Sequence, residues 1–272
     1  GILVKSGEAL ETAGKVNAVM LDKTGTVTTG SPVVTDIITA PGADETAALT
    51  LAAAAEKQSE HPLAKAILAA AEQRSITVPD AEGFKASAGH GVDCTVNGMH
   101  IAMGSARLMR EQGIDNPLEE RAAALSAEGK TPIYMAADGK LTALFAVADA
   151  IKPDAVEAIR LLKEMNVKLV MLTGDSYRAA KATAAMLGIT DYKCQVLPED
   201  KHRYVEEMKQ NGQKVIMVGD GINDTPALAA ANVSVAMNDA SDIARETADI
   251  TIKGSDLRAL VRVRKLSKDL MK

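Results

Sequence analysis

The chain has 272 residues, of which 47% are apolar and 25% charged, proportions typical of a globular protein with one large or two ordinary domains. A net charge of -5, no Trp, two Phe and four Tyr argue against a nucleic-acid partner, because such binding needs clustered basic side chains and stacking aromatics. Cys94 and Cys194 form no CxxC pattern, which indicates a reducing compartment and no structural metal site.

The first predicted element is a strand at Val16–Leu21, whose continuous apolar character indicates burial on both faces of a sheet. It leads directly into Asp22 and the loop "DKTGT", with Thr24 two positions after the aspartate. An acidic residue at the carboxyl end of a buried strand is well placed for a ligand site.

Residues 31–145 have a different character and predict an inserted α+β domain. Ala-rich helical patterns alternate there with runs of period two, which are typical of half-buried strands. The predicted helices are 45–55, 62–74 and 117–128, and the strand-like runs are 93–103 and 132–147.

After the insertion, strands and helices alternate, which predicts a parallel sheet covered by helices on both sides. Residues 1–30 and 146–272 therefore form one Rossmann-like α/β domain. Its remaining predicted strands are 167–172, 214–218 and 233–237, and its predicted helices are 154–165, 177–187, 199–211 and 224–231.

Acidic loops follow three of these strands and meet at one edge of the sheet. Asp22 follows the first strand, Asp175 lies in "TGD", and Asp220 and Asp224 lie in "GDGIND". A single aspartate there could be only a helix cap, but three such loops favour a site. Gathered carboxylates need a cation, and hard oxygen ligands suit Mg²⁺. Lys201 could supply a fixed positive charge to the same place, although a solvated helix lysine is the alternative.

The residue at position 24 bears on the chemistry. An aspartate carboxylate can attack phosphorus and form an aspartyl-phosphate. Hydrolysis then needs a general acid or base, and the Thr24 hydroxyl cannot act as one near neutral pH. The loop therefore predicts a site that forms an acyl phosphate and holds it.

Together, "DKTGTVT", "TGD" and "GDGINDTPAL" resemble the catalytic core of the P-type ATPases, which have the haloacid-dehalogenase-like fold. "SEHPLAKAI", residues 59–67, is similar to the heavy-metal-transporting branch. "GILVKSGEALE" and "DKTGTVT" resemble copper(I) pumps more than zinc or cadmium pumps, although a zinc- or cadmium-transporting ATPase is an alternative. The resemblance covers essentially the whole chain.

The resemblance implies that ATP phosphorylates Asp22, with Mg²⁺ held by Asp22, the Thr24 carbonyl and Asp220. It also implies that Asp149 is a hinge acid where the chain returns to the first domain. The full implied catalytic set is Asp22, Lys23, Thr24, Thr173, Gly174, Asp175, Lys201, Asn223 and Asp224.

In the inserted domain, the resemblance implies an ATP-binding site. Ser105 lies directly after Gly104, the last of the implied nucleotide-binding residues, and many relatives have Asn at this position. Taken singly, each glycine is more simply interpreted as a turn residue, and the histidine as a structural residue. The implied nucleotide-binding residues are Glu56, His61, Gly89, Gly91 and Gly104.

The resemblance further implies that the chain is the cytosolic fragment of an integral membrane pump. Its partners would be ATP and the transmembrane and actuator domains of the same pump, and the transported ion would bind outside this fragment. Two alternatives are a soluble phosphatase of the same fold, which would need a carboxylate at position 24, and a nucleotide sensor without catalysis.

Overall fold

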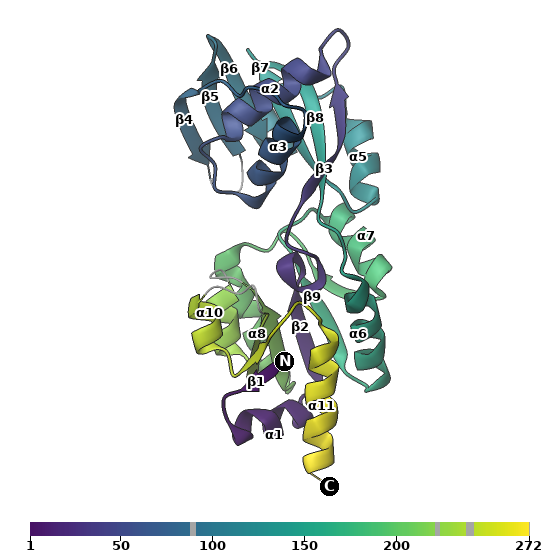
Figure 1. The fold of residues 1–272 in the computed structure, drawn as a ribbon. Helices are drawn as coiled ribbons and strands as arrows, with labels where there is room; N and C mark the ends of the chain where they lie inside the picture. The colour runs from purple at the N-terminus through teal and green to yellow at the C-terminus, as the bar shows by residue number, and fades with distance from the viewer. Residues whose placement is uncertain (88–90, 221–223, 238–241, 272) are drawn as a thin grey trace. The chain divides into compact units, whose positions relative to one another are not determined.

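The computed structural model describes residues 1–87, 91–220, 224–237 and 242–271 (Figure 1). The chain divides into two compact units: unit 1 comprises Gly1–Gly30 and Ala150–Lys272, and unit 2 comprises Ser31–Asp149. The sequence places the return to the first domain at residue 146. In the structure the last strand of unit 2 continues to Ala148, and unit 1 resumes at Ala150.

Unit 1 contains a seven-stranded sheet, as far as the described residues show, in the order β1-β13-β12-β11-β2-β9-β10. Every pairing is parallel except β1 with β13. The fold class expected from the sequence is therefore confirmed. The strands are β1 (Ile2–Val4), β2 (Ala18–Asp22), β9 (Lys168–Leu172), β10 (Asp191–Lys193), β11 (Val215–Gly219), β12 (Val233–Met237) and β13 (Ile250–Ile252).

Helices cover both faces of this sheet. Alternate residues of β2 show this directly: Val19 and Leu21 belong to one apolar core, and Ala18 and Met20 to another. Helices α1, α6, α7 and α11 pack into the first core, and α8 and α9 pack into the second. The helices are α1 (Gly7–Lys15), α6 (Pro153–Glu164), α7 (Tyr177–Leu187), α8 (Lys201–Gln210), α9 (Thr225–Ala230), α10 (Asp242–Thr247) and α11 (Arg258–Leu270).

The described residues of unit 2 form a six-stranded antiparallel sheet in the order β3-β8-β7-β6-β5-β4. One core lies between this sheet and helices α2 and α3, and a second lies between the sheet and α4 and α5. The strands are β3 (Val33–Thr39), β4 (Glu82–Ser87), β5 (Gly91–Val96), β6 (Met99–Gly104), β7 (Thr131–Ala137) and β8 (Lys140–Ala148). The helices are α2 (Glu45–Glu56), α3 (Pro62–Gln73), α4 (Ala106–Glu111) and α5 (Glu119–Ala127).

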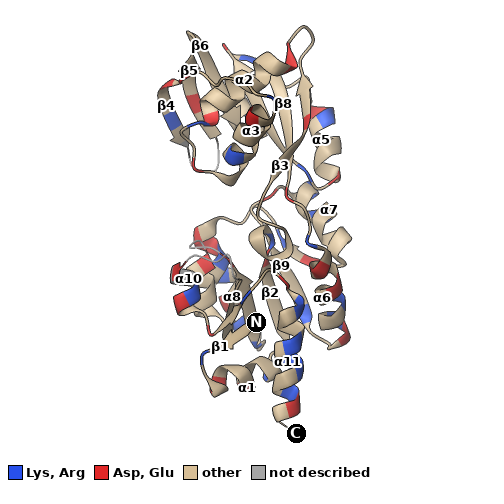
Figure 2. Cartoon of the chain, viewed as in Figure 1, with Lys and Arg blue, Asp and Glu red and all other residues tan. Residues whose placement is uncertain are grey.

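Acidic and basic residues are interspersed over both units, and the most continuous run of basic residues lies along α11 (Figure 2). Within the described part of the chain, the helices are too short or too polar to cross a bilayer.

Candidate functional site

The candidate site lies at the carboxyl ends of the central strands of unit 1. Asp22 is the last residue of β2, and it lies between β9 and β11 in the sheet. Asp220 follows the end of β11, and Asp224 immediately precedes α9. Because these strands run parallel, their ends meet at one edge, as the sequence predicts.

The three carboxylates form one cluster. Asp22, Asp220 and Asp224 each offer an oxygen, and these oxygens all lie within 4.8 Å of one another. The Lys201 Nζ, at the start of α8, donates to Asp22 Oδ1 at 2.9 Å and to Asp224 Oδ1 at 2.7 Å. The second oxygen of Asp224 accepts the Asp220 backbone N–H at 3.2 Å. Lys201 is buried here and is not a solvated helix lysine.

Burial and mutual repulsion perturb these carboxylates. Burial, reinforced by the charge of Asp224, raises the pKa of Asp22 to about 8 despite the opposing Lys201. The same two causes raise the pKa of Asp220 to about 6. Burial lowers the pKa of the Lys201 ammonium, but Asp22 and Asp224 together raise it above its ordinary value. The cluster has three carboxylates and one ammonium, so it lacks positive charge. The carboxylate oxygens are ligands that suit a hard divalent cation such as Mg²⁺.

A second ion pair supports the neighbouring loop. The Lys23 Nζ pairs with Asp175 Oδ2, and both side chains are largely buried. The Asp175 backbone N–H donates to the Thr173 hydroxyl at 3.1 Å. A Cβ on Gly174 would meet only the Val196 carbonyl, at 3.5 Å, so steric crowding does not explain a glycine there. This pair connects the loop after β2 with the loop after β9.

The loop after Asp22 begins with a type II turn. Thr24 has φ -69° and ψ 124°, and Gly25 has φ 74° and ψ -8°, which are the values of the two central positions of that turn. A Cβ on Gly25 would lie 1.6 Å from Asp220 Oδ2. Glycine at this position therefore satisfies both the positive φ and the close approach to the carboxylate.

In unit 2, the predicted nucleotide-binding residues lie at helix and strand ends. Glu56 is the buried last residue of α2, and burial raises its pKa. His61 caps α3, its Nδ1 accepting the Leu63 N–H at 3.2 Å, and partial desolvation lowers the pKa of its ring. A neutral ring with this cap carries its proton on Nε2.

Two glycines of the predicted nucleotide site lie on neighbouring strands. Gly91 of β5 pairs with Gly104 of β6, and α2 packs against β5. Gly91 has φ 145°, and a Cβ there would lie 2.0 Å from the Met103 carbonyl, so the close strand pairing requires glycine. Ser105 caps α4 through its hydroxyl, which accepts the Leu108 N–H. Gly89 of the predicted nucleotide site, and Asn223 of the predicted catalytic set, lie outside the described residues.

Two further residues near the site are absent from the predicted set. Lys152 is buried, its Nζ donates to the Ser255 carbonyl at 2.7 Å, and its charge acts to lower the pKa of Asp220. Thr28 hydrogen-bonds within the loop after Asp22. The sequence signal for Lys152 is weak, because the Pro that follows it indicates only a helix start. The sequence signal for Thr28 is its place as the last residue of "DKTGTVT". Asp149 lies half-buried at the end of unit 2.

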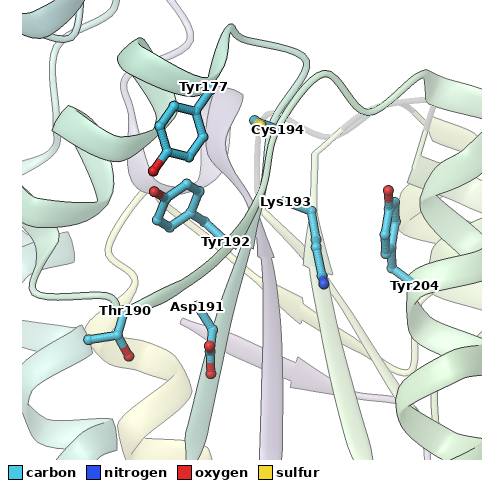
Figure 3. A pocket seen from close by; sticks show the side chains of 7 residues that line it. All are labelled: Tyr177, Thr190, Asp191, Tyr192, Lys193, Cys194 and Tyr204. Carbon is cyan, nitrogen blue, oxygen red and sulfur yellow. The ribbon is translucent and has the colours of Figure 1, made fainter.

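A shallow depression of about 460 Å³, none of whose lining residues belongs to the predicted set, lies on the edge strand β10 (Figure 3). The Tyr177 and Tyr192 rings face each other there, with centroids 6.2 Å apart, and the Lys193 Nζ lies 5.7 Å from the Tyr204 ring centroid. These ring contacts are explained by protection of an edge strand. The lining residues are Tyr177, Thr190, Asp191, Tyr192, Lys193, Cys194 and Tyr204.

Comparison with known proteins gives matches over the whole chain. A family model described as haloacid dehalogenase-like hydrolase matches residues 16–232. The chain is 47% identical over 272 residues to a copper-exporting P-type ATPase of Legionella pneumophila, covering 100% of this chain and 37% of that protein. It is 42% identical over 274 residues to a silver exporting P-type ATPase of Salmonella typhimurium, covering 100% of this chain and 33% of the relative. The chain thus spans well under half of the length of these relatives.

Solved structures agree with these matches. The catalytic CPx-ATPase domain CopB-B has a TM-score of 0.76 and 32% identity, over 97% of this chain and 95% of that chain. A zinc-transporting PIB-type ATPase in the E2.Pi state has a TM-score of 0.75 and 39% identity, over 100% of this chain and 44% of that chain.

Proposed function

Because this chain belongs to the haloacid dehalogenase-like hydrolases, and within them to the catalytic domains of the CPx-type ATPases, we propose that it phosphorylates itself on Asp22 from ATP as part of a heavy-metal pump. One observation carries this proposal. The Lys201 ammonium bridges Asp22 and Asp224, and Asp220 completes a compact buried cluster at the end of β2. A nucleophile, a fixed positive charge and hard oxygen ligands thus occur together.

In the proposed reaction, an Asp22 carboxylate oxygen attacks the γ-phosphorus of ATP. The bond from that phosphorus to the β,γ-bridging oxygen breaks, and ADP leaves with the electron pair. Lys201 stabilises the charge that develops on the transferring group, and it also orients the attacking carboxylate. Lys23 and Asp175 keep the flanking loops in place.

Burial raises the pKa of Asp22 to about 8, so below that pH its proton must pass to solvent before the carboxylate attacks. Asp22, the Thr24 carbonyl and Asp220 would hold Mg²⁺, which would supply positive charge to both the carboxylates and the phosphate oxygens. Thr24 provides no acid or base for hydrolysis, and for this reason the aspartyl-phosphate would persist. That feature favours a pump intermediate over a soluble phosphatase of the same fold.

Unit 2 is the proposed ATP-binding part. Glu56 supplies an acceptor at the end of α2, and His61 supplies an Nε2–H donor at the start of α3. The pairing of Gly91 with Gly104 places two residues without side chains opposite each other on neighbouring strands. A donor and an acceptor of this kind match the exocyclic amine and a ring nitrogen of adenine.

Copper(I) is the proposed cargo of the complete pump. Several similar curated proteins are named copper-exporting or copper-transporting ATPases. The similar zinc-transporting structure makes zinc the second candidate. In either case the ion would pass through the membrane helices of the complete pump, and this chain would act with them and with the actuator domain from the cytoplasmic side.

Incubation of the chain with γ-labelled ATP and Mg²⁺ tests the proposal. We expect acid-stable, hydroxylamine-sensitive label on the unmodified chain and on Asp191→Asn, whose carboxylate lies on the exposed edge strand. We expect none on Asp22→Asn, because an amide cannot attack phosphorus. Equal labelling of Asp22→Asn would refute Asp22 as the acceptor. Steady release of phosphate without accumulated label would favour the phosphatase.

A further inference from the structure

Thr28 closes the loop that follows Asp22. It is 1% exposed. Its Oγ1 accepts the Gly25 N–H at 3.2 Å and donates to the Lys23 carbonyl at 3.2 Å. Its backbone N–H donates to the same carbonyl at 3.2 Å. One side chain thus holds two peptide groups of a five-residue loop.

The bond to Gly25 fixes the orientation of a peptide plane. The Gly25 N–H and the Thr24 carbonyl belong to the same trans peptide, so they point in opposite directions. Holding this N–H against the Thr28 hydroxyl therefore directs the Thr24 carbonyl to the other side of the loop. Type I and type II turns differ by a flip of this middle peptide, and a glycine at the third position accommodates either form. The turn alone therefore does not fix the direction of the Thr24 carbonyl, whereas the hydrogen bond between the Gly25 N–H and the Thr28 hydroxyl does.

Thr28 is itself held by the returning chain of unit 1. It forms an isolated antiparallel bridge with Ile151. On either side of it, the Thr29 N–H donates to the Ala150 carbonyl at 2.9 Å, and the Lys152 N–H donates to the Val27 carbonyl at 2.9 Å. The hydroxyl is therefore presented from a fixed backbone, which is what a positioning group requires.

We propose that Thr28 is a positioning residue whose hydroxyl orients the Thr24–Gly25 peptide and so presents the Thr24 carbonyl to the divalent cation of the phosphorylation site. This assignment rests on the proposed function of Asp22. The hydrogen bonds of the Thr28 hydroxyl described above are to backbone groups of the loop. Its effect is on the pose of a backbone ligand, and it acts before any nucleotide binds.

The test compares Thr28→Val, which keeps the shape and removes the hydroxyl, with Thr28→Ser, which keeps the hydroxyl. In the metal-free chain, we expect hydrogen exchange of the Gly25 amide to be about tenfold faster or more in Thr28→Val and nearly unchanged in Thr28→Ser. We expect Mg²⁺ titrated into Thr28→Val to bind about tenfold more weakly. Labelling by ATP should slow by on the order of 10–100-fold.

Thr183→Val is the matched control, because it makes the same exchange at a buried threonine of α7. If Thr28→Val does not fold, Thr28→Cys, with a weak acceptor of similar size, should show the same changes to a smaller extent. Unchanged Gly25 exchange in Thr28→Val, or equal defects in Thr28→Ser and Thr28→Val, overturns the assignment. If ATP does not label the unmodified chain, the proposed function is overturned instead. The hydrogen-exchange and Mg²⁺ measurements then still decide whether Thr28 positions the Thr24–Gly25 peptide.

Discussion

At the scale of single residues, the proposed role of Asp22 as a nucleophile sets two opposing requirements. A nucleophile must be ionised, yet burial and Asp224 raise its pKa to about 8. Lys201 offsets only part of this cost, because it is shared with Asp224. A buried charge without compensation is unfavourable, so the site would become reactive only when another cation joins it.

The first prediction concerns pH. Mg²⁺ must displace the protons that Asp22 and Asp220 retain below pKa values of about 8 and about 6, so its affinity falls as pH falls through that range. Calorimetric titration between about pH 5 and 9 should show affinity rising by up to about tenfold per unit for each displaced proton.

Asp22→Asn provides the control for this measurement. The amide carries no negative charge, so the variant should bind Mg²⁺ more weakly. The amide also does not titrate, so the pH dependence around the pKa of Asp22 should disappear, and the dependence around the pKa of Asp220 should remain. An Mg²⁺ affinity that does not vary with pH in the unmodified chain would contradict the assignment of these carboxylates as ligands.

Sequence reasoning identified the acidic residues of this site because each follows a strand, and parallel strands end at one edge. It left Lys201 open, since a lysine in the first turn of a helix looks the same whether it is solvated or buried. It did not identify Thr28 or Lys152. The backbone around both residues is placed by the antiparallel approach of residues 27–29 to residues 150–152, which are far apart in the chain, and the Lys152 Nζ bonds to Ser255, which is farther away still.

At the scale of elements, α1 and α11 form a tight pair. The buried Arg264 of α11 donates from one nitrogen to the Ala13 and Val16 carbonyls, at 2.8 and 2.7 Å, where α1 ends. A Cβ on Gly14 would lie 2.3 Å from the Ser267 Oγ, so a glycine lets the two helices approach closely. Arg264 thus satisfies carbonyls that the helix end leaves without partners.

The second prediction tests this pair. Arg264→Met should lower the free energy of unfolding by about 2–4 kcal/mol, because it leaves buried carbonyls unsatisfied. Lys265→Met, at the next and exposed position of the same helix, should change it by less than about 0.5 kcal/mol. Urea unfolding measures both variants. Equal effects would show that Arg264 contributes packing and not helix capping.

The predicted elements of unit 1 show what pattern reasoning detects. The four continuous apolar runs correspond to β2, β9, β11 and β12, because burial on both faces leaves a strong signal. The three-residue strands β1, β10 and β13 were not predicted. They lie toward the edges of the sheet, and three residues are too few to show a period.

At the scale of the whole molecule, unit 2 has its own cores and its own sheet. Its first strand, β3, pairs with its last, β8, and Val33 lies opposite Ala148. Its two ends are therefore neighbours. A segment with a complete core and adjacent ends is expected to fold when it is separated from its host.

The third prediction follows from this arrangement. Residues 31–149 expressed alone should fold and bind ATP with the affinity of the full chain, because Glu56, His61, Gly91 and Gly104 all lie within them. Calorimetry on both proteins, each with a His61→Ala control, measures this. Much weaker binding by the isolated segment would mean that unit 1 contributes to the nucleotide site.

The pairing of Val33 with Ala148, continued by the bridge between Thr28 and Ile151, also affects how the host sheet assembles. Joining β2 to its returning partner β9 across a long unstructured chain would carry a loop-closure entropy that grows with length. Once the insertion has folded, its adjacent ends make that connection behave like a short turn. If the insertion folds first, the loop-closure cost of its length is removed before the host sheet pairs.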